Sequence, residues 1–317
     1  MKALVRILPG FLVKFFARPY VAGDSLDKGL MATRQLLERG LLTTFDLLSE
    51  NVESRGQVDA VCRVYREMVE ACAGFPDPET RPSISLKPSS FTTSPLDQGD
   101  GASAEGSAEA IGELAELSRH KGVRLSIDME DHHWTDWTLD FVRELHARGH
   151  DHVGAVLQTR LHRTMADLDR LPPGARVRLV IGIYLESPEL ATTDKREMKE
   201  RMLQAAGILL ERGYYVEFGT HDEAVIERFL TETVPESGAG PDRYEIQMLF
   251  GVPRESLQRK LREGALGSGG AVRTRIYVPF ATSWRHAIAY CRRRLLENPS
   301  IVTMGLRNLA RGLSGRR

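Results

Sequence analysis

The chain is poor in cysteine, in long apolar runs and in excess charge of either sign. Its three cysteines, Cys62, Cys72 and Cys291, are scattered and lack the spacing of metal ligands. This scarcity argues against a disulfide framework or a zinc site and for a reducing compartment. No apolar run approaches the roughly 20 residues that span a bilayer. The formal net charge is zero, so no positive field favours nucleic acid as a partner.

The first twenty residues lack the small-residue cleavage site of a signal peptide. In this segment a few lysines and arginines are spread among Leu, Val, Ile and Phe, and Pro9-Gly10 interrupts the apolar sequence. Two interpretations stay open: a basic amphipathic segment that touches a membrane surface, or a terminal helix on the flank of the protein's own core. We expect residues 1–40 to form a helical segment that packs on one large domain over residues 41–317.

Short strand-like runs alternate with longer helical patterns about eight times, without an internal repeat. The runs are residues 41–46, 83–87, 123–128, 152–158, 176–182, 214–218, 244–249 and 272–278. This alternation predicts a (β/α)8 TIM-like barrel of the α/β class. An open doubly wound sheet is the alternative, but its Gly-rich dinucleotide fingerprint follows none of the runs.

Chemistry in such barrels sits where strands end and loops begin. Polar or special residues end most of the predicted strands: Asp46, Lys87, Asp128, Gln158, Tyr184, His221, Gln247 and Tyr277. Because the carboxyl ends of all strands meet at one mouth, we expect these side chains to converge there.

Lys87 and Asp128 are the first candidates. Lys87 ends a strand directly before a proline, and it would pair with a bound carboxylate or with Asp128, or else be a solvated loop lysine. Asp128 ends an apolar strand, where an aspartate is costly to bury without a partner; Lys87 or arginines across the mouth would serve. The alternative is an N-cap of the following helix. Glu130 and Asp131 are interpreted as surface charges.

Two further strand ends carry polar groups. Arg178 lies within an apolar run, where a charge requires a partner; it would reach a flavin carbonyl or form a structural salt bridge. Thr220 and His221 follow a strand directly, and their donors suit a phosphate or pyrophosphate. The alternative there is a helix cap by Thr220 or Asp222.

Three other histidines invite a metal interpretation. His132, His133 and His162 have no HExxH motif or His/carboxylate triad beside them. We therefore interpret them as surface or capping residues and expect no metal site.

An arginine run near the end of the chain suggests an anion site. Arg292, Arg293 and Arg294 are consecutive in a helical context, and guanidinium groups bind carboxylates through two parallel hydrogen bonds. On a helix, Glu297 would lie beside Arg293 and Arg294 and hold either in position. The run is interpreted as a clamp for a small carboxylic acid, with a solvated basic helix face as the alternative.

Several segments together carry a family resemblance. They are FARPYVAG (16–23), TFDLLSE (44–50), SISLK (83–87), SIDME (126–130), RLVIGIY (178–184), FGTHD (218–222), YEIQMLFG (244–251), RIYVPF (275–280) and YCRRRLLEN (290–298). In this order they resemble the proline dehydrogenases, flavin-dependent enzymes of the first step of proline catabolism, in their monofunctional bacterial form. The likeness covers nearly the whole chain.

The resemblance implies oxidation of L-proline to Δ1-pyrroline-5-carboxylate, with hydride passing to flavin N5. The implied catalytic residues are Lys87, Asp128, Leu249, Tyr277, Tyr290, Arg293, Arg294 and Glu297. Arg293 and Arg294 would grip the proline carboxylate, while Leu249, Tyr277 and Tyr290 would enclose the pyrrolidine ring.

The resemblance also implies FAD, held non-covalently at the barrel mouth, which would supply the hydride chemistry. The implied cofactor-binding residues are Gln158, Arg178, Val180, Gly182, Tyr184, Thr220, His221, Asp222 and Gln247. A membrane quinone would take the electrons, so we expect a cytoplasmic protein with peripheral contact to the inner face of the membrane.

The likeness departs from the family pattern around the cofactor. The usual Lys-Gly-Ala-Tyr run is Ile181-Gly182-Ile183-Tyr184 here, the usual Gln-Ala-Tyr is Gln158-Thr159-Arg160, and a glycine is replaced by Ala281. These changes keep an alternative open: a paralogous flavoenzyme of the same fold that oxidises a different cyclic or secondary amino acid in a specialised pathway.

Overall fold

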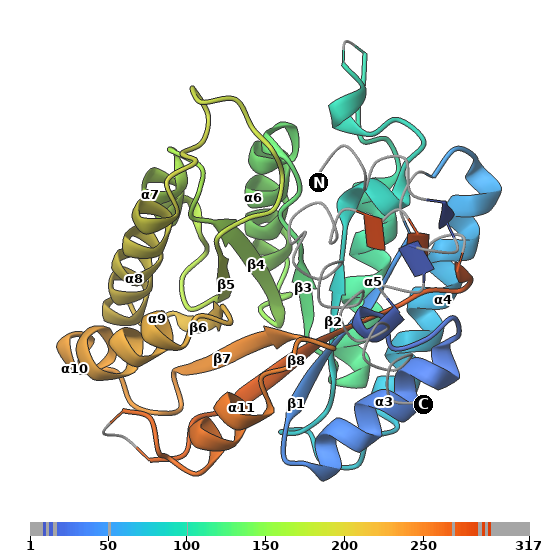
Figure 1. Cartoon of the computed structure of the whole chain (residues 1–317). Coiled ribbons are helices and arrows are strands. Elements are labelled where there is room, and N and C mark those ends of the chain that lie inside the picture. Colours follow the sequence, from blue (N-terminus) through green and yellow to red (C-terminus); the bar gives the residue numbers. More distant parts are fainter. Residues whose placement is uncertain are drawn as a thin grey trace.

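Eight parallel strands pair in chain order and close into a barrel (Figure 1). The computed structural model describes residues 9–10, 13–14, 18–49, 52–99, 101–267, 270–284, 287–288 and 291–292. The strands are β1 (Leu42–Leu47), β2 (Ser83–Leu86), β3 (Leu125–Ile127), β4 (Val153–Gln158), β5 (Arg176–Val180), β6 (Tyr215–Gly219), β7 (Tyr244–Leu249) and β8 (Thr274–Phe280). β8 completes the ring by pairing with β1. The predicted (β/α)8 barrel is confirmed, and the open sheet is wrong.

Helices form the outer layer around these strands (Figure 1). The α-helices are α3 (Leu26–Glu38), α4 (Arg55–Ala73), α5 (Ser107–Lys121), α6 (His132–Ala147), α7 (Thr164–Asp167), α8 (Lys195–Glu211), α9 (Glu223–Arg228), α10 (Val234–Ser237) and α11 (Glu255–Arg262). The 3-10 helices are η1 (Arg18–Tyr20), η2 (Pro88–Phe91), η3 (Leu96–Gln98) and η4 (Leu168–Arg170). A π-helix, η5 (Phe229–Thr233), joins α9 to α10. None of the described helices is both long and apolar enough to cross a bilayer.

Local capping explains where several helices begin. The side chains of Ser54, Asp131 and Asp194 each accept a hydrogen bond from a backbone N–H two or three residues further on, at the starts of α4, α6 and α8. Such caps satisfy donors that have no partner within the helix.

Helix α3 packs directly against the barrel wall at β1 and β8. Gly29 on this helix lies so near Phe45 that a Cβ would be 2.4 Å from the ring. Phe45 in turn stacks on Phe280, with ring centroids 4.5 Å apart. The absence of a side chain at Gly29 thus lets the helix approach the junction where the barrel closes.

The barrel interior contains a layer of buried charges. Arg176 donates from Nε to Glu217 Oε1 at 2.9 Å and lies 3.4 Å, from Nη2, from Glu245 Oε2. Arg275 pairs with Glu245, and both are almost fully buried. Buried charges persist only when they are paired and hydrogen-bonded. We call Arg176, Glu217, Glu245 and Arg275 the lower charge layer. Its two glutamates accept hydrogen bonds from Gln247 at the carboxyl end of β7.

Candidate functional site

A cavity of about 300 Å³ opens at the carboxyl ends of the strands. All eight polar or special residues at the predicted strand ends line it: Asp46, Lys87, Asp128, Gln158, Tyr184, His221, Gln247 and Tyr277. The expectation that these positions converge on one mouth is confirmed. Every strand contributes, because parallel strands in a closed barrel end at the same face.

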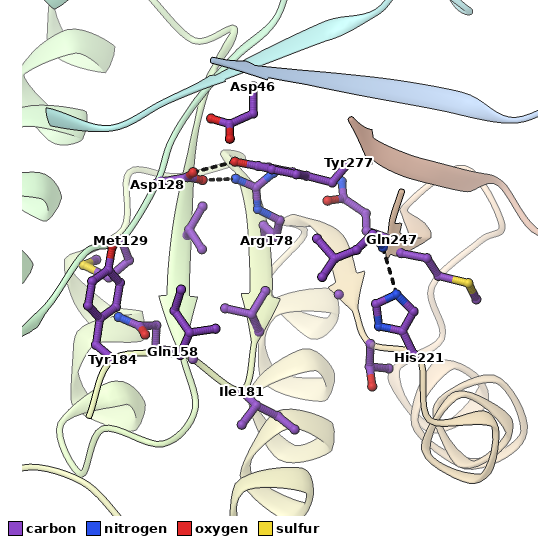
Figure 2. Close-up of a pocket in the computed structure, with 18 of the residues that line it drawn as sticks. Asp46, Asp128, Met129, Gln158, Arg178, Ile181, Tyr184, His221, Gln247 and Tyr277 are labelled. Carbon is purple, nitrogen blue, oxygen red and sulfur yellow. Dashed lines mark hydrogen bonds and ion pairs between the residues drawn. The ribbon is translucent and has the colours of Figure 1, made fainter. Parts of the chain in front are cut away.

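A connected floor network is formed by four of these side chains, Asp46, Lys87, Asp128 and Tyr277, together with Arg178. Figure 2 shows the bonds from Asp128 to Arg178 and to Tyr277. Lys87 Nζ lies 2.7 Å from Asp46 Oδ1 and 3.2 Å from Asp128 Oδ2. The other oxygen of Asp128 accepts from Arg178 Nη2, and Tyr277 donates its hydroxyl to Asp128 Oδ2 at 2.8 Å. Two cations and two carboxylates thus alternate beneath the cavity.

The network sets the protonation of its members. Burial would lower the pKa of Lys87, but Asp46, Tyr277 and Asp128 outweigh burial and raise that pKa well above its ordinary value. Burial would raise the pKa of Asp128, but Lys87 and Arg178 lower it to about 2. Burial raises the pKa of Asp46, and the nearby charge of Asp128 adds to this effect, although Lys87 and Tyr277 oppose it. Lys87 and Asp128 therefore remain charged across the working range of pH.

The structure decides the open alternatives for Lys87 and Asp128. The side chain of Lys87 is 12% exposed and paired with Asp128, so the solvated-lysine interpretation is wrong. Asp128 does not cap a helix, because Asp131 accepts from His133 N at 3.0 Å at the start of α6. Arg178 forms a salt bridge with Asp128, while its contact with a flavin stays a prediction.

The interpretation of Glu130 as a surface charge is wrong. It is 7% exposed, and its carboxylate accepts from Ser89 N at 2.9 Å and Ser89 Oγ at 2.6 Å. Burial raises its pKa to about 7. The sequence showed only a polar residue in a loop after a strand. The loop after β2, which covers it, comes some forty residues earlier in the chain.

The opposite wall contains residues expected to hold a cofactor. Gln158 Nε2 donates to Glu130 O at 2.6 Å, which orients the carboxamide. Val180 and Tyr184 line the cavity beside Gly182. Gly182 has φ +98°, and a Cβ there would lie 2.5 Å from Gln158 Oε1. Glycine is thus required here both for backbone conformation and for space.

Thr220 and His221 also line the cavity. His221 Nε2 accepts from Leu249 N at 2.9 Å, so in the neutral ring the proton is on Nδ1. Asp222 is not among the lining residues; its side chain caps α9 and pairs with Lys199. The cap that the sequence left open as an alternative is therefore present at Asp222.

Three buried polar atoms of the lining have no hydrogen-bond partner within the described part of the chain. They are Arg178 Nη1, a donor, and Asp46 Oδ2 and Gln247 Oε1, two acceptors. Buried polar groups are almost always paired in folded proteins. These three atoms are the part of the lining whose hydrogen-bonding capacity is left unused.

The remaining candidates lie apart from this floor or outside the described residues. Tyr290, Arg293, Arg294 and Glu297 fall outside them, so the carboxylate clamp stays a prediction. Potential ligand atoms of Asp131, His132 and His133 lie within 4.8 Å of one another. His132 Nδ1, however, lies 2.6 Å from Glu186 Oε2, and Asp131 is used as a helix cap.

The comparison with protein families decides the relationship. A family model described as "Proline dehydrogenase" matches residues 30–304. The chain belongs to the proline dehydrogenase family. It is 30% identical to the proline dehydrogenase of Deinococcus radiodurans, over 93% of this chain and 90% of that one. It is also 30% identical to proline dehydrogenase 2 of Bacillus subtilis, over 92% of this chain and 89% of that one.

Solved structures with low sequence identity share the fold. Proline utilization A from Bdellovibrio bacteriovorus, inactivated by N-propargylglycine, superposes with a TM-score of 0.78 at 22% identity. The alignment covers 89% of this chain and 32% of that chain. The same barrel fold therefore also occurs as part of a much longer protein.

Proposed function

We propose that this protein is an FAD-dependent proline dehydrogenase that oxidises L-proline to Δ1-pyrroline-5-carboxylate. Membership of the family supports the substrate class. The observation that carries the proposal is the floor network of Asp46, Lys87, Asp128, Arg178 and Tyr277 beneath a cavity of about 300 Å³. Proline is a zwitterion, and a floor of alternating cations and carboxylates complements both of its charges.

The cavity wall fits a flavin. Arg178 Nη1 offers a buried, unpartnered donor and Gln247 Oε1 a buried, unpartnered acceptor, and a flavin ring presents both acceptors and a donor. Gly182 and Gly219 line the wall, and close contacts with neighbouring protein atoms leave no room for a side chain at either position. Gln158, Tyr184 and the Thr220–His221 turn would hold the rest of the FAD. When bound, the flavin supplies the acceptor for the substrate's hydride.

The chain's own residues would orient the substrate. Lys87 carries a stable positive charge for the proline carboxylate, together with Arg293 and Arg294. Leu249 and Tyr277 line the cavity and would confine the apolar ring. Asp46, whose pKa is raised by burial, would accept the proton that the substrate amine must lose. We further propose a quinone as electron acceptor and a cytoplasmic location with peripheral membrane contact, because the resemblance implies both.

The test uses the purified full chain. With FAD added, we expect a yellow protein that reduces a dye acceptor when L-proline is supplied. A protein that binds no flavin would overturn the proposal. Flavin binding without proline oxidation, but with oxidation of another cyclic or secondary amino acid, would favour the paralogous flavoenzyme instead.

A further inference from the structure

Residues 181–194, which connect β5 to α8, form one wall of the cavity and are called the wall segment below. Gly182 and Tyr184 on this segment line the cavity. None of residues 181–190 is buried as a whole, and Leu185 is 83% exposed. A loop with few buried apolar contacts opens at low cost in free energy. The position of the wall segment therefore depends on its polar contacts.

One edge of the wall segment is bound to the chain that follows β4. Arg160 N donates to Ile181 O at 3.1 Å, and His162 N donates to Leu190 O at 2.9 Å. Between these two points, Arg160 Nη1 donates to Tyr184 O. These hydrogen bonds hold the segment from one side only, so the side that faces α6 requires a contact of its own.

The side chain of Glu186 supplies that contact. It is 5% exposed, although its neighbours Leu185 and Ser187 are exposed. Its Oε1 accepts from His132 N at 2.9 Å, and its Oε2 lies 2.6 Å from His132 Nδ1. A carboxylate only accepts hydrogen bonds, so Nδ1 carries the hydrogen here. One side chain of the wall segment thus binds both the backbone and the ring of the same residue.

The start of α6 is a favourable place for this carboxylate. The N–H groups of a first helical turn have no partner within the helix, and the helix dipole favours negative charge there. His132 is the first residue of α6 and comes four residues after Asp128 of the floor network. Glu186 therefore joins the wall segment to the loop that carries Asp128 and Met129. Tyr184 and Met129 lie together at one side of the cavity (Figure 2).

We propose that Glu186 is a positioning residue, which holds Gly182 and Tyr184 at the cavity through its contact with His132. The inference rests on the proposed function. The contact fixes the wall in advance, so that FAD does not have to order the segment when it binds. A site arranged in advance binds more tightly, because less conformational freedom is lost on binding. Breaking the contact should therefore weaken FAD binding and leave the floor network intact.

The test measures dissociation constants for FAD by flavin fluorescence, with the full-length protein. Glu186→Ala and His132→Ala should each weaken binding about tenfold, the effect of losing a hydrogen bond to a charged group. The double variant should bind no more weakly than the poorer single variant, because both substitutions break the same contact. Two matched controls should bind FAD like the wild type: Glu189→Ala, an exposed carboxyl in the wall segment, and His133→Ala, the next residue of α6.

A second measurement separates positioning from a general loss of stability. Chymotrypsin cuts after tyrosine and leucine, so it reports whether the chain around Tyr184 and Leu185 opens in the apoprotein. Glu186→Ala should be cut there faster than the wild type and Glu189→Ala, and added FAD should slow the cut. At saturating FAD, kcat and the KM for proline should keep their wild-type values. A general loss of stability would instead raise cleavage throughout the chain, which would count against positioning.

Two results would overturn the inference and leave the proposed function intact. One is wild-type affinity for FAD in Glu186→Ala. The other is an additive loss in the double variant, because Glu186 and His132 would then act separately. Failure of the wild-type protein to bind FAD would overturn the proposed function, and the inference with it. Should Glu186→Ala fail to fold, Glu186→Gln, which keeps the size of the side chain and removes its charge, takes its place.

Discussion

At the scale of single residues, Glu130 shows how burial changes a carboxyl group. Its carboxylate accepts two hydrogen bonds from Ser89, and its backbone oxygen accepts one from Gln158. It therefore joins the loop that follows Lys87 to the wall expected to hold the cofactor. Even with these bonds, burial raises its pKa from 4.5 to about 7.

This pKa makes the stability of the protein depend on pH. A carboxyl whose folded pKa lies above its unfolded value stabilises the fold at low pH, and that stability is lost as pH rises from about 4.5 to about 7. In the wild type, the free energy of unfolding should therefore decrease between about pH 5 and about pH 8. Glu130→Gln should reduce this decrease by on the order of 2 kcal/mol. Urea unfolding at the two pH values measures it.

A surface carboxyl provides the control for this prediction. Glu105 has a side chain that is 74% exposed, so Glu105→Gln should leave the dependence of the unfolding free energy on pH unchanged. A profile that is the same in Glu130→Gln and in the wild type would show that Glu130 does not titrate in this range.

At the scale of elements, strand β5 is flanked by two glycines with positive φ. Gly174 precedes it with φ +73°, and a Cβ there would meet nothing within 4 Å. Gly182 follows it with φ +98°, and a Cβ there would lie 2.5 Å from Gln158 Oε1. The two positions share backbone strain but differ in available space, so they form a matched pair.

Gly174→Ala should lower the free energy of unfolding by about 1 kcal/mol, because it introduces only backbone strain. Gly182→Ala should cost at least about 1 kcal/mol more, because the methyl group must displace the side chain of Gln158. It should also weaken FAD binding, which Gly174→Ala should not. Thermal unfolding and flavin titration of both variants check this. Equal effects of the two substitutions would contradict the close contact at Gly182.

At the scale of the whole molecule, the lower charge layer joins strands that close the barrel. Glu245 pairs with Arg275 and contacts Arg176, and its side chain is 1% exposed. Removing one partner of a buried ion pair leaves an uncompensated charge, whereas an exposed pair contributes little. Breaking a pair in this layer should therefore cost far more stability than breaking a surface ion pair.

Glu245→Gln should lower the free energy of unfolding by about 3 kcal/mol or more. The matched control is Glu223→Gln, which breaks the half-exposed pair with Lys260 and should cost less than about 1 kcal/mol. Urea denaturation of both variants gives the comparison. A similar loss in both would show that the layer is not a source of stability.

The sequence by itself determined the barrel and its mouth. The alternation of strand-like and helical runs is a local pattern, and parallel strands force the strand ends to one face, so Lys87, Asp128 and Gln247 could be placed together without coordinates. Fold class and the convergence of the lining residues follow from this short-range information. The carboxylate clamp at Arg293 and Arg294 stays a prediction.

Only the tertiary structure decided which charges are buried and which atoms each one meets. Glu130 is covered by a loop some forty residues earlier in the chain, and Glu245 meets Arg275 on the next strand. The orientation of Gln247 depends on carboxylates from two strands at once. Hydrogen-bond partners across a barrel are far apart in sequence, and no local pattern of residues encodes their pairing.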